Sequence, residues 1–313
     1  MNPTSHQDIE YSSSKTLKSL SVITSIAVFC LISLGGIVRV TDSGLACPDW
    51  PLCHGKIIPP FEFHVIIEYS HRLLALIVSC LVVAITICVF RLPGHNSGLR
   101  KMILVSWVLL GIQILLGGMT VLTELRPEFI ALHLATAQAF FGVLLLLTCR
   151  VLIQDSRKGT TAALWLADRP LFVTLILIFA TIISGSLVTN TGAFAACAGW
   201  PLCNGQLFPT NHLAGIHWLH RLIVLITVLS VFWLFLSGRK QRTKSLSQTF
   251  ILLLSIAMTI QILIGAATIW LHFTPFWRAI HLTVSALVWG TAVINFGLAL
   301  FNPGNKGTLR SSA

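Results

Sequence analysis

The chain has 313 residues, of which 55% are hydrophobic and only 10% are charged, and its mean hydropathy is +0.85. Roughly a quarter of the residues of a soluble domain are charged, so this composition excludes an ordinary soluble protein and indicates a polytopic membrane protein. The net charge of +11 would also fit a nucleic-acid partner, so the distribution of the basic residues has to decide that question.

Apolar runs of about 20 residues, the length that crosses the hydrocarbon as a helix, occur eight times along the chain. The runs are continuous in Leu, Ile, Val and Ala, without the alternation of period two that is typical of a transmembrane barrel. We therefore predict an all-α polytopic membrane protein with eight transmembrane helices. The expected spans are 17–40, 65–90, 102–123, 129–152, 169–189, 214–237, 248–270 and 276–300.

The basic residues gather on one side of this predicted topology. Eight spans put both termini on the same side, which carries 15 of the 21 basic residues and four of the ten acidic residues. The other side carries six basic and six acidic residues, so the whole excess lies where the positive-inside rule places the cytoplasm. The net positive charge is therefore explained without a nucleic-acid partner. With no signal-peptide pattern before residue 17, we expect cytoplasmic termini, most simply in a bacterial inner membrane.

The chain contains an internal repeat, in which similar segments recur at an offset of 148 to 150 residues. The segment CPDWPLCHG at 47–55 returns as CAGWPLCNG at 197–205, and the pair His71-Arg72 returns as His220-Arg221. Each half holds an even number of spans, so the repeat is parallel and lacks the inverted symmetry of many transporters. We predict two parallel-repeat four-helix bundles. The expected divisions are a cytoplasmic tail 1–16, an N-terminal half 17–153, a cytoplasmic linker 154–169, a C-terminal half 170–300 and a cytoplasmic tail 301–313.

Four histidines occupy matching positions, near the outer ends of the second and fourth spans of each half. Each lies five or six residues inside its span, roughly 8 to 9 Å along a helix. Two histidines at one depth in a bundle can hold both axial positions of a haem iron, which predicts His71 with His133 and His220 with His281. Interfacial or hydrogen-bonded core histidines are the alternative. Zinc is disfavoured because no third ligand recurs at that depth.

An arginine directly follows each second-span histidine. Arg72 and Arg221 could pair with haem propionates, which need cationic partners where they turn toward water. The alternative is that these long side chains only extend to the interface for hydration. Nearby glycines leave space for a flat macrocycle or permit close helix packing. These glycines are Gly35, Gly36, Gly117, Gly118, Gly185 and Gly265.

Each half also carries a Cys-x5-Cys segment between its first and second spans. Cys47 with Cys53 and Cys197 with Cys203 are local pairs on the expected oxidising side, so each is a candidate disulfide. The spacing differs from the Cys-x2-Cys of a zinc ribbon. A redox-active role is the alternative to a simple staple that closes the loop.

The halves differ three residues before the second-span histidine, where the first half has Glu68 and the second has His217. A carboxylate there supplies a base or a charge stabiliser beside the haem face. The difference suggests that the first half performs chemistry and the second holds a permanent redox cofactor. The alternative is that Glu68 only pairs with a neighbouring cation such as Arg72.

The joint pattern resembles the haem A synthase family, from about residue 35 to residue 295. The residues that carry the resemblance are IIEYSHR at 66–72, the two Trp-Pro-Leu-Cys segments, ALH at 131–133 and the duplicated halves. The resemblance implies an oxidoreductase that converts haem O to haem A for cytochrome oxidase, oxidising a ring methyl to a formyl by successive hydroxylations. It implies a substrate site at His71 and His133 with Glu68 as the catalytic acid residue. It also implies a haem b held by His220 and His281 that accepts electrons.

The resemblance further implies partners: haem O, membrane lipid, a haem O synthase, cytochrome oxidase assembly factors and an electron acceptor that the sequence does not name. The two cysteine pairs match pairs that some family members carry and others lack. Two other classes stay open, namely a di-haem b electron-transfer protein without haem-modifying activity and a structural or transport protein without haem. The difference between Glu68 and His217 counts against the first of these.

Overall fold

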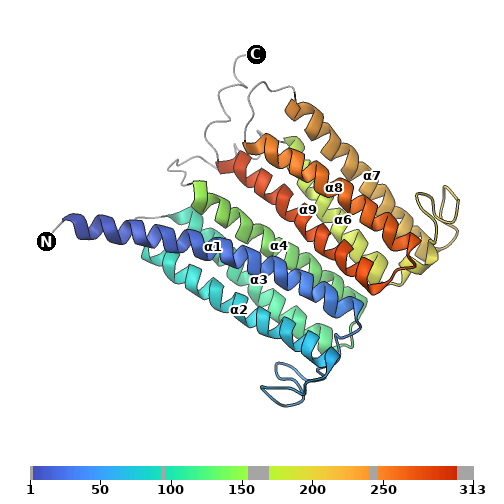
Figure 1. Ribbon diagram of the computed structural model, residues 1–313, viewed down its shortest axis with the longest axis horizontal. Helices are drawn as coiled ribbons and strands as arrows, with labels where there is room; N and C mark the ends of the chain where they lie inside the picture. Colours follow the sequence, from blue (N-terminus) through green and yellow to red (C-terminus); the bar gives the residue numbers. More distant parts are fainter. Residues whose placement is uncertain (1–2, 93–95, 154–168, 240–245, 302–313) are drawn as a thin grey trace.

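The computed structural model describes residues 3–92, 96–153, 169–239 and 246–301 (Figure 1). Within these residues, eight helices are long and apolar enough to cross a membrane, which confirms the predicted all-α polytopic fold. The helices are α1 (Pro3–Val40), α2 (Phe63–Arg91), α3 (Ser97–Leu122), α4 (Pro127–Ile153), α6 (Arg169–Asn190), α7 (His212–Arg239), α8 (Leu246–Trp270) and α9 (Pro275–Phe301). A short 3-10 helix, η1 (Ala193–Ala196), follows α6.

Several helices begin before the apolar runs that predict them. The first helix begins at Pro3, so most of the expected tail 1–16 continues α1, whose apolar span starts at Lys15. Polar residues can extend a helix beyond the hydrocarbon, so hydropathy locates a span better than it locates a helix end. The expected linker 154–169 and tail 301–313 lie outside the described residues, apart from Arg169 and Phe301.

Within each half the four helices contact one another in the same cyclic order. In the first half α1 contacts α2 and α4, and α3 contacts the same two helices. In the second half α6 contacts α7 and α9, and α8 contacts the same two helices. The halves meet where α9 packs on α1 and α4 and where α4 packs on α6 (Figure 1). The division into two repeat bundles stays a prediction, and this shared order supports it.

The core of the protein lies at this seam between the halves. Phe141 and Leu144 of α4, Ile178 of α6, and Trp289 and Val293 of α9 belong to one buried apolar cluster. The Trp289 indole Nε1 donates a hydrogen bond to the Gln138 carbonyl at 2.8 Å, so the one polar group of that ring is satisfied. The seam therefore buries apolar surface without leaving the indole N–H unpaired.

The four outer helices expose apolar side chains where lipid would surround them. Leu76 of α2, Leu104 of α3, Leu229 of α7 and Leu263 of α8 are all more than half exposed. Such a surface is unfavourable in water, but lipid tails are as apolar as leucine, and helices satisfy their own backbone polar groups. The exposed surface thus agrees with the multi-pass membrane protein that composition predicts.

The two long loops that carry the cysteines lie at the same end of the molecule. The α1–α2 loop and the α6–α7 loop are opposite the start of α1 and the end of α9 (Figure 1). Cys47 and Cys53 form a disulfide with a Cα–Cα distance of 4.7 Å, and Cys197 and Cys203 form one at 4.8 Å. Both loops thus fold at the end where the second and fourth helices of each half begin.

Candidate functional site

Each predicted ligand histidine lies in the loop-proximal part of its helix and faces a glycine on a neighbouring helix. The histidines of α2 and α7 are eight residues from the helix start, and those of α4 and α9 are six, so the depths match between the halves. An added Cβ would lie 3.1 to 3.5 Å from the ring at every one of these glycines. The pairs are His71 with Gly35, His133 with Gly117, His220 with Gly185, and His281 with Gly265.

The two predicted histidine pairs interact within each half. His220 and His281 line one cavity, and His71 and His133 interact electrostatically. Among the described residues no group of three or more His, Cys, Asp or Glu side chains could hold a bare metal ion. Two histidines suit an iron whose other four ligands come from a macrocycle.

A cavity of about 660 Å³ is lined mostly by residues of the second half, among them His220 and His281, and also by Val40 and Leu134 of the first half. Its volume falls in the range of roughly 300 to 1,000 Å³ that is usual for ligand and cofactor sites. The walls are mainly apolar, and the loop residues Trp200 and Leu202 also line it. The second-half loop therefore forms part of the cavity wall, and the donor set and space fit a haem.

Hydrogen bonds restrain both ligand rings in the second half. The Ser184 hydroxyl lies 2.9 Å from His220 Nδ1. The Gln261 amide nitrogen lies 3.2 Å from His281 Nδ1 and 3.3 Å from His281 Nε2, so it contacts the ring without selecting one nitrogen. Gln261 also donates to the His281 carbonyl at 3.0 Å. Partners of this kind fix the ring orientation and tautomer of a metal-ligating histidine and make it a better ligand.

The ligand rings of the first half are less restrained. Gln113 donates to the His133 carbonyl at 2.9 Å, as its counterpart does in the second half. However, His133 Nδ1 is buried without a hydrogen bond, and the ring of His71 has no hydrogen-bond partner among the described residues. Leu34 stands where the second half has Ser184. An unpaired buried ring nitrogen is a group that a bound ligand or water could satisfy.

Three residues around the histidines, Gln113, Gln261 and Ser184, differ in the signal that the sequence carries for them. Gln113 and Gln261 recur at the same offset as the histidines that they support, so the repeat carried their signal although no role was predicted. Ser184 has no counterpart in the first half, so comparison of the halves gives no signal for it.

Glu68 is buried, with only 4% of its surface exposed. Its Oε1 accepts a hydrogen bond from Arg72 Nη2 at 2.6 Å, and its Oε2 accepts the backbone N–H of Cys47 at 2.7 Å. These are the contacts expected if Glu68 only pairs with its neighbouring cation. The same two bonds also hold the carboxylate three residues from His71, and residues three apart share a helix face.

The second-half counterpart of Glu68 is equally buried but forms no ion pair. His217 is 5% exposed, and its Nε2 lies 3.4 Å from Arg221 Nη2. Its Nδ1 makes no hydrogen bond with the described residues. The exchange of Glu68 for His217 therefore removes the acidic partner of the arginine.

The two arginines tie the cysteine loops to the second helix of each half. Arg72 donates to the Asp49 carbonyl at 2.7 Å and to the Cys47 carbonyl at 3.0 Å. Arg221 donates to the Pro201 carbonyl at 3.0 Å and weakly to the Cys197 carbonyl at 3.5 Å. The sequence did not predict this role, because the acceptors are backbone groups. Binding of propionates by either arginine stays a prediction.

A second tether joins each loop to the same helix turn. The Tyr69 hydroxyl donates to the Ile57 carbonyl at 2.5 Å, and the Trp218 Nε1 donates to the Leu207 carbonyl at 2.7 Å. Tyr69 and Trp218 occupy equivalent positions, two residues before the histidines His71 and His220. The helix turn that carries His71 or His220 is thus also hydrogen-bonded to the cysteine loop that precedes the helix.

Within the first loop, Asp49 closes the segment between the cysteines. Its carboxylate accepts the N–H of Gly55 at 2.9 Å and the N–H of His54 at 2.6 Å. These backbone hydrogen bonds, that of Gly55 above all, hold the pKa of Asp49 below its ordinary value. In the second loop the neutral Asn204 accepts the N–H of Ala198 at 2.9 Å, so the fold of the loop does not require a charge.

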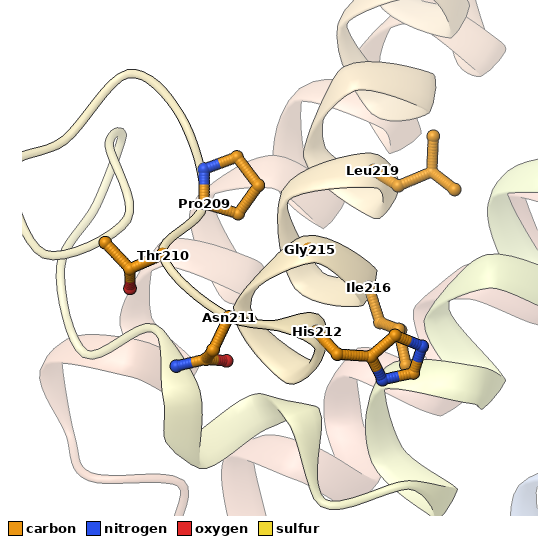
Figure 2. A pocket seen from close by; sticks show the side chains of 7 residues that line it. All are labelled: Pro209, Thr210, Asn211, His212, Gly215, Ile216 and Leu219. Carbon is orange, nitrogen blue, oxygen red and sulfur yellow. The ribbon is translucent and has the colours of Figure 1, made fainter.

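A shallow depression at the start of α7 contains none of the predicted site residues. Figure 2 shows Pro209, Thr210 and Asn211 approaching the first turns of the helix, which present His212, Gly215, Ile216 and Leu219. Asn211 Oδ1 accepts the N–H of Ala214 at 2.9 Å, which is the hydrogen bond of a helix N-cap. Asn211 therefore acts as the N-cap of α7.

Known proteins resemble this chain over most of its length. Residues 18–64 and 60–293 match the family model COX15-CtaA, described as cytochrome oxidase assembly protein. Proteins named "Heme A synthase" are similar to it. That of Shouchella clausii is 34% identical over 79% of this chain and 84% of the relative, and that of Alkalihalophilus pseudofirmus is 32% identical over 76% and 82%. The chain therefore belongs to the COX15-CtaA family of cytochrome oxidase assembly proteins.

Proposed function

We propose that this protein is a haem A synthase, an oxidoreductase that converts a ring methyl of haem O to a formyl by successive hydroxylations. The observation that carries the proposal is the duplicated histidine pair, with a buried carboxylate at only one of the two sites. The relatives named "Heme A synthase" support it. The product would be the haem A of cytochrome oxidase, in keeping with the description of the family.

The substrate site of this proposal lies in the first half. His71 and His133 would hold haem O, and Glu68 would place an anionic group beside it. Glu68 is held from both sides by Arg72 and by the Cys47 N–H, so it needs little reorganisation to stabilise positive charge. Arg72 stays a candidate partner for a propionate at this site. The unpaired ring nitrogen of His133 leaves this ligand free to adjust to a substrate that must enter and leave.

The second half would hold a resident haem b between His220 and His281. A bound haem supplies a one-electron redox centre to such a site. Ser184 and Gln261 would keep the two rings oriented, and the cavity of about 660 Å³ offers the space. Arg221 lines this cavity and stays a candidate for a propionate.

The membrane orientation belongs to the same proposal. The cysteine loops would lie on the outer side of the cell membrane, where disulfides persist, and both termini would lie in the cytoplasm. Haem O would arrive through membrane lipid from a haem O synthase. The electron acceptor and the cytochrome oxidase assembly factors would be partners outside this chain.

The test is to express the full chain with a source of haem O and identify the extracted haems by mass. Haem A is expected only when both the chain and haem O are present. A chain that binds haem but never yields haem A would instead support the di-haem b electron-transfer alternative. A purified protein with no Soret absorption would contradict both haem-based functions.

A further inference from the structure

One of the residues that line the second-half cavity is an arginine, Arg278, that has no counterpart in the repeat. Arg278 lies on α9, three residues before His281, and both residues line the cavity. Residues three apart share a helix face. At 1.5 Å per residue, Arg278 lies about 4.5 Å closer than His281 to the end of the molecule that carries the cysteine loops. Its guanidinium lies 5.4 Å from the ring centre of Phe194, which also lines the cavity. The cation is thus held against an aromatic wall at the mouth of the site.

Arg278 forms no ion pair with an acidic side chain among the described residues. Arg39 and Asp42 act on it electrostatically with opposite signs, and these two residues lie 3.8 Å from each other. The cavity is lined by two cations, Arg221 and Arg278, and by no aspartate or glutamate. Arg221 donates to loop carbonyls, but its buried Nε has no hydrogen-bond partner. Partly buried cations without an ion-pair partner are costly, so the cavity is suited to an anionic occupant.

The first half lacks this excess of positive charge. There the arginine of the second helix is paired with Glu68 at 2.6 Å, so the two charges cancel. The sequence around His133 aligns with that around His281 at an offset of 148, with Pro127 opposite Pro275 and Ala131 opposite Ala279. In this alignment Ile130 stands where the second half has Arg278. The first half therefore has neither of the two uncompensated cations.

We infer that Arg278, together with Arg221, binds the two propionates of the haem held by His220 and His281. The inference rests on the proposed function and extends it. Arginine offers a rigid fork of donors that suits a carboxylate, and a charge-assisted hydrogen bond in a partly dry site is strong. The resident haem is retained by these charges, whereas the substrate haem of the first half, without them, can leave after oxidation.

The test measures how fast haem b leaves the purified full-length protein when an excess of apomyoglobin captures it. Arg278→Gln is expected to speed release from the second site by about tenfold or more, since one charge-assisted hydrogen-bond pair is lost. Arg278→Lys keeps the charge and should be faster than wild type but slower than Arg278→Gln. The reciprocal variant Ile130→Arg is expected to slow release from the first site. His71→Ala and His220→Ala versions identify which site each release phase belongs to.

A modified ligand tests the same point without any substitution. Wild-type protein loaded with haem b dimethyl ester, whose propionates carry no charge, should release it as fast as Arg278→Gln releases haem b. In the Arg278→Gln variant the release rates of haem b and of its dimethyl ester should differ less than in wild type, because only Arg221 is left to bind a propionate. Equal release of haem b and its ester from wild type would overturn the inference while leaving the proposed function intact. A wild-type protein that binds no haem would overturn the proposed function and the inference with it.

Discussion

The two halves of the chain place their histidines alike but surround them with different chemistry. Both halves set a histidine from the second helix near one from the fourth, and both tether a disulfide loop to the turn before the first histidine. In the first half the rings lack hydrogen bonds at Nδ1, and the nearby arginine is neutralised by Glu68. In the second half hydrogen bonds orient both rings, and the cations are uncompensated.

This difference teaches how a duplicated scaffold can divide two tasks. A site that exchanges its ligand gains little from strong anchoring, because the free energy that holds the substrate also holds the product. A site for a permanent cofactor gains from oriented ligands and from charge pairs. The repeated features therefore describe how a haem is held, and the features that are not repeated distinguish the site for chemistry from the site for retention. Four substitutions test this division.

The largest effect is expected at Glu68. Glu68→Gln keeps the size of the side chain but removes its charge, and we expect haem A formation to fall by about 100-fold or more, as for loss of a general acid–base group. Haem O or a hydroxylated intermediate should accumulate, which mass analysis of extracted haems would detect. Glu128→Gln, at an exposed acid at the start of α4, is the matched control. Haem A at the wild-type level in Glu68→Gln would remove this carboxylate from the mechanism.

The next effect is expected at His220. His220→Ala removes one of the two proposed axial ligands of the resident haem, so the purified protein should lose most of its haem b. The measurement is haem extraction together with the Soret spectrum. His71→Ala, the matched change in the first half, should instead lower binding of haem O and spare haem b. Unchanged haem b content in His220→Ala would refute the assignment of the second site.

Much of the fold and of the candidate ligand set follows from the sequence, because hydropathy and self-comparison both carry strong signals. Continuous apolar runs mark a membrane span whatever its tertiary contacts are. A residue such as His133 that returns at the repeat offset must do something that both halves need. The start of α1 at Pro3 was missed because polar residues beyond the hydrocarbon leave no hydropathy signal.

The contacts of the loops could not be predicted, for a different reason. Arg72 and Arg221 donate to backbone carbonyls, and a carbonyl acceptor leaves no trace in the residue types of the loop. Tyr69 and Trp218 make equivalent hydrogen bonds with different chemical groups, so comparing the residue types of the two halves does not reveal their shared role. Ser184 and Arg278 act in one half only, where a search for repeats finds nothing.

A smaller effect is expected at the glycines that face the ligand rings. An added Cβ at Gly265 would lie 3.1 Å from His281, which is tighter than ordinary contact, whereas at the equivalent Gly117 it would lie 3.5 Å from His133. We expect Gly265→Ala to shift the ring and lower haem b occupancy by a fewfold, about what 1 kcal/mol of misfit produces. Gly117→Ala should leave haem binding in the first half nearly unchanged. Equal effects of the two substitutions would show that crowding of the ring at these two positions does not govern haem binding.

The smallest effect is expected at Ser184, and it tests the division between the halves most directly. Ser184→Ala removes the hydroxyl 2.9 Å from His220 Nδ1 and leaves the ring in place, so haem b should still bind. The lost hydrogen bond should weaken the ligand, raising the rate of haem b release by about two- to tenfold and shifting its reduction potential. Thr174→Val, at another buried hydroxyl on the same helix that does not line the cavity, is the control. The reciprocal Leu34→Ser should slow haem release from the first half, because it supplies His71 with the partner that its counterpart has. If Ser184→Ala changes neither release nor potential, orientation of the ring does not account for retention, and the charges of Arg221 and Arg278 must carry it alone.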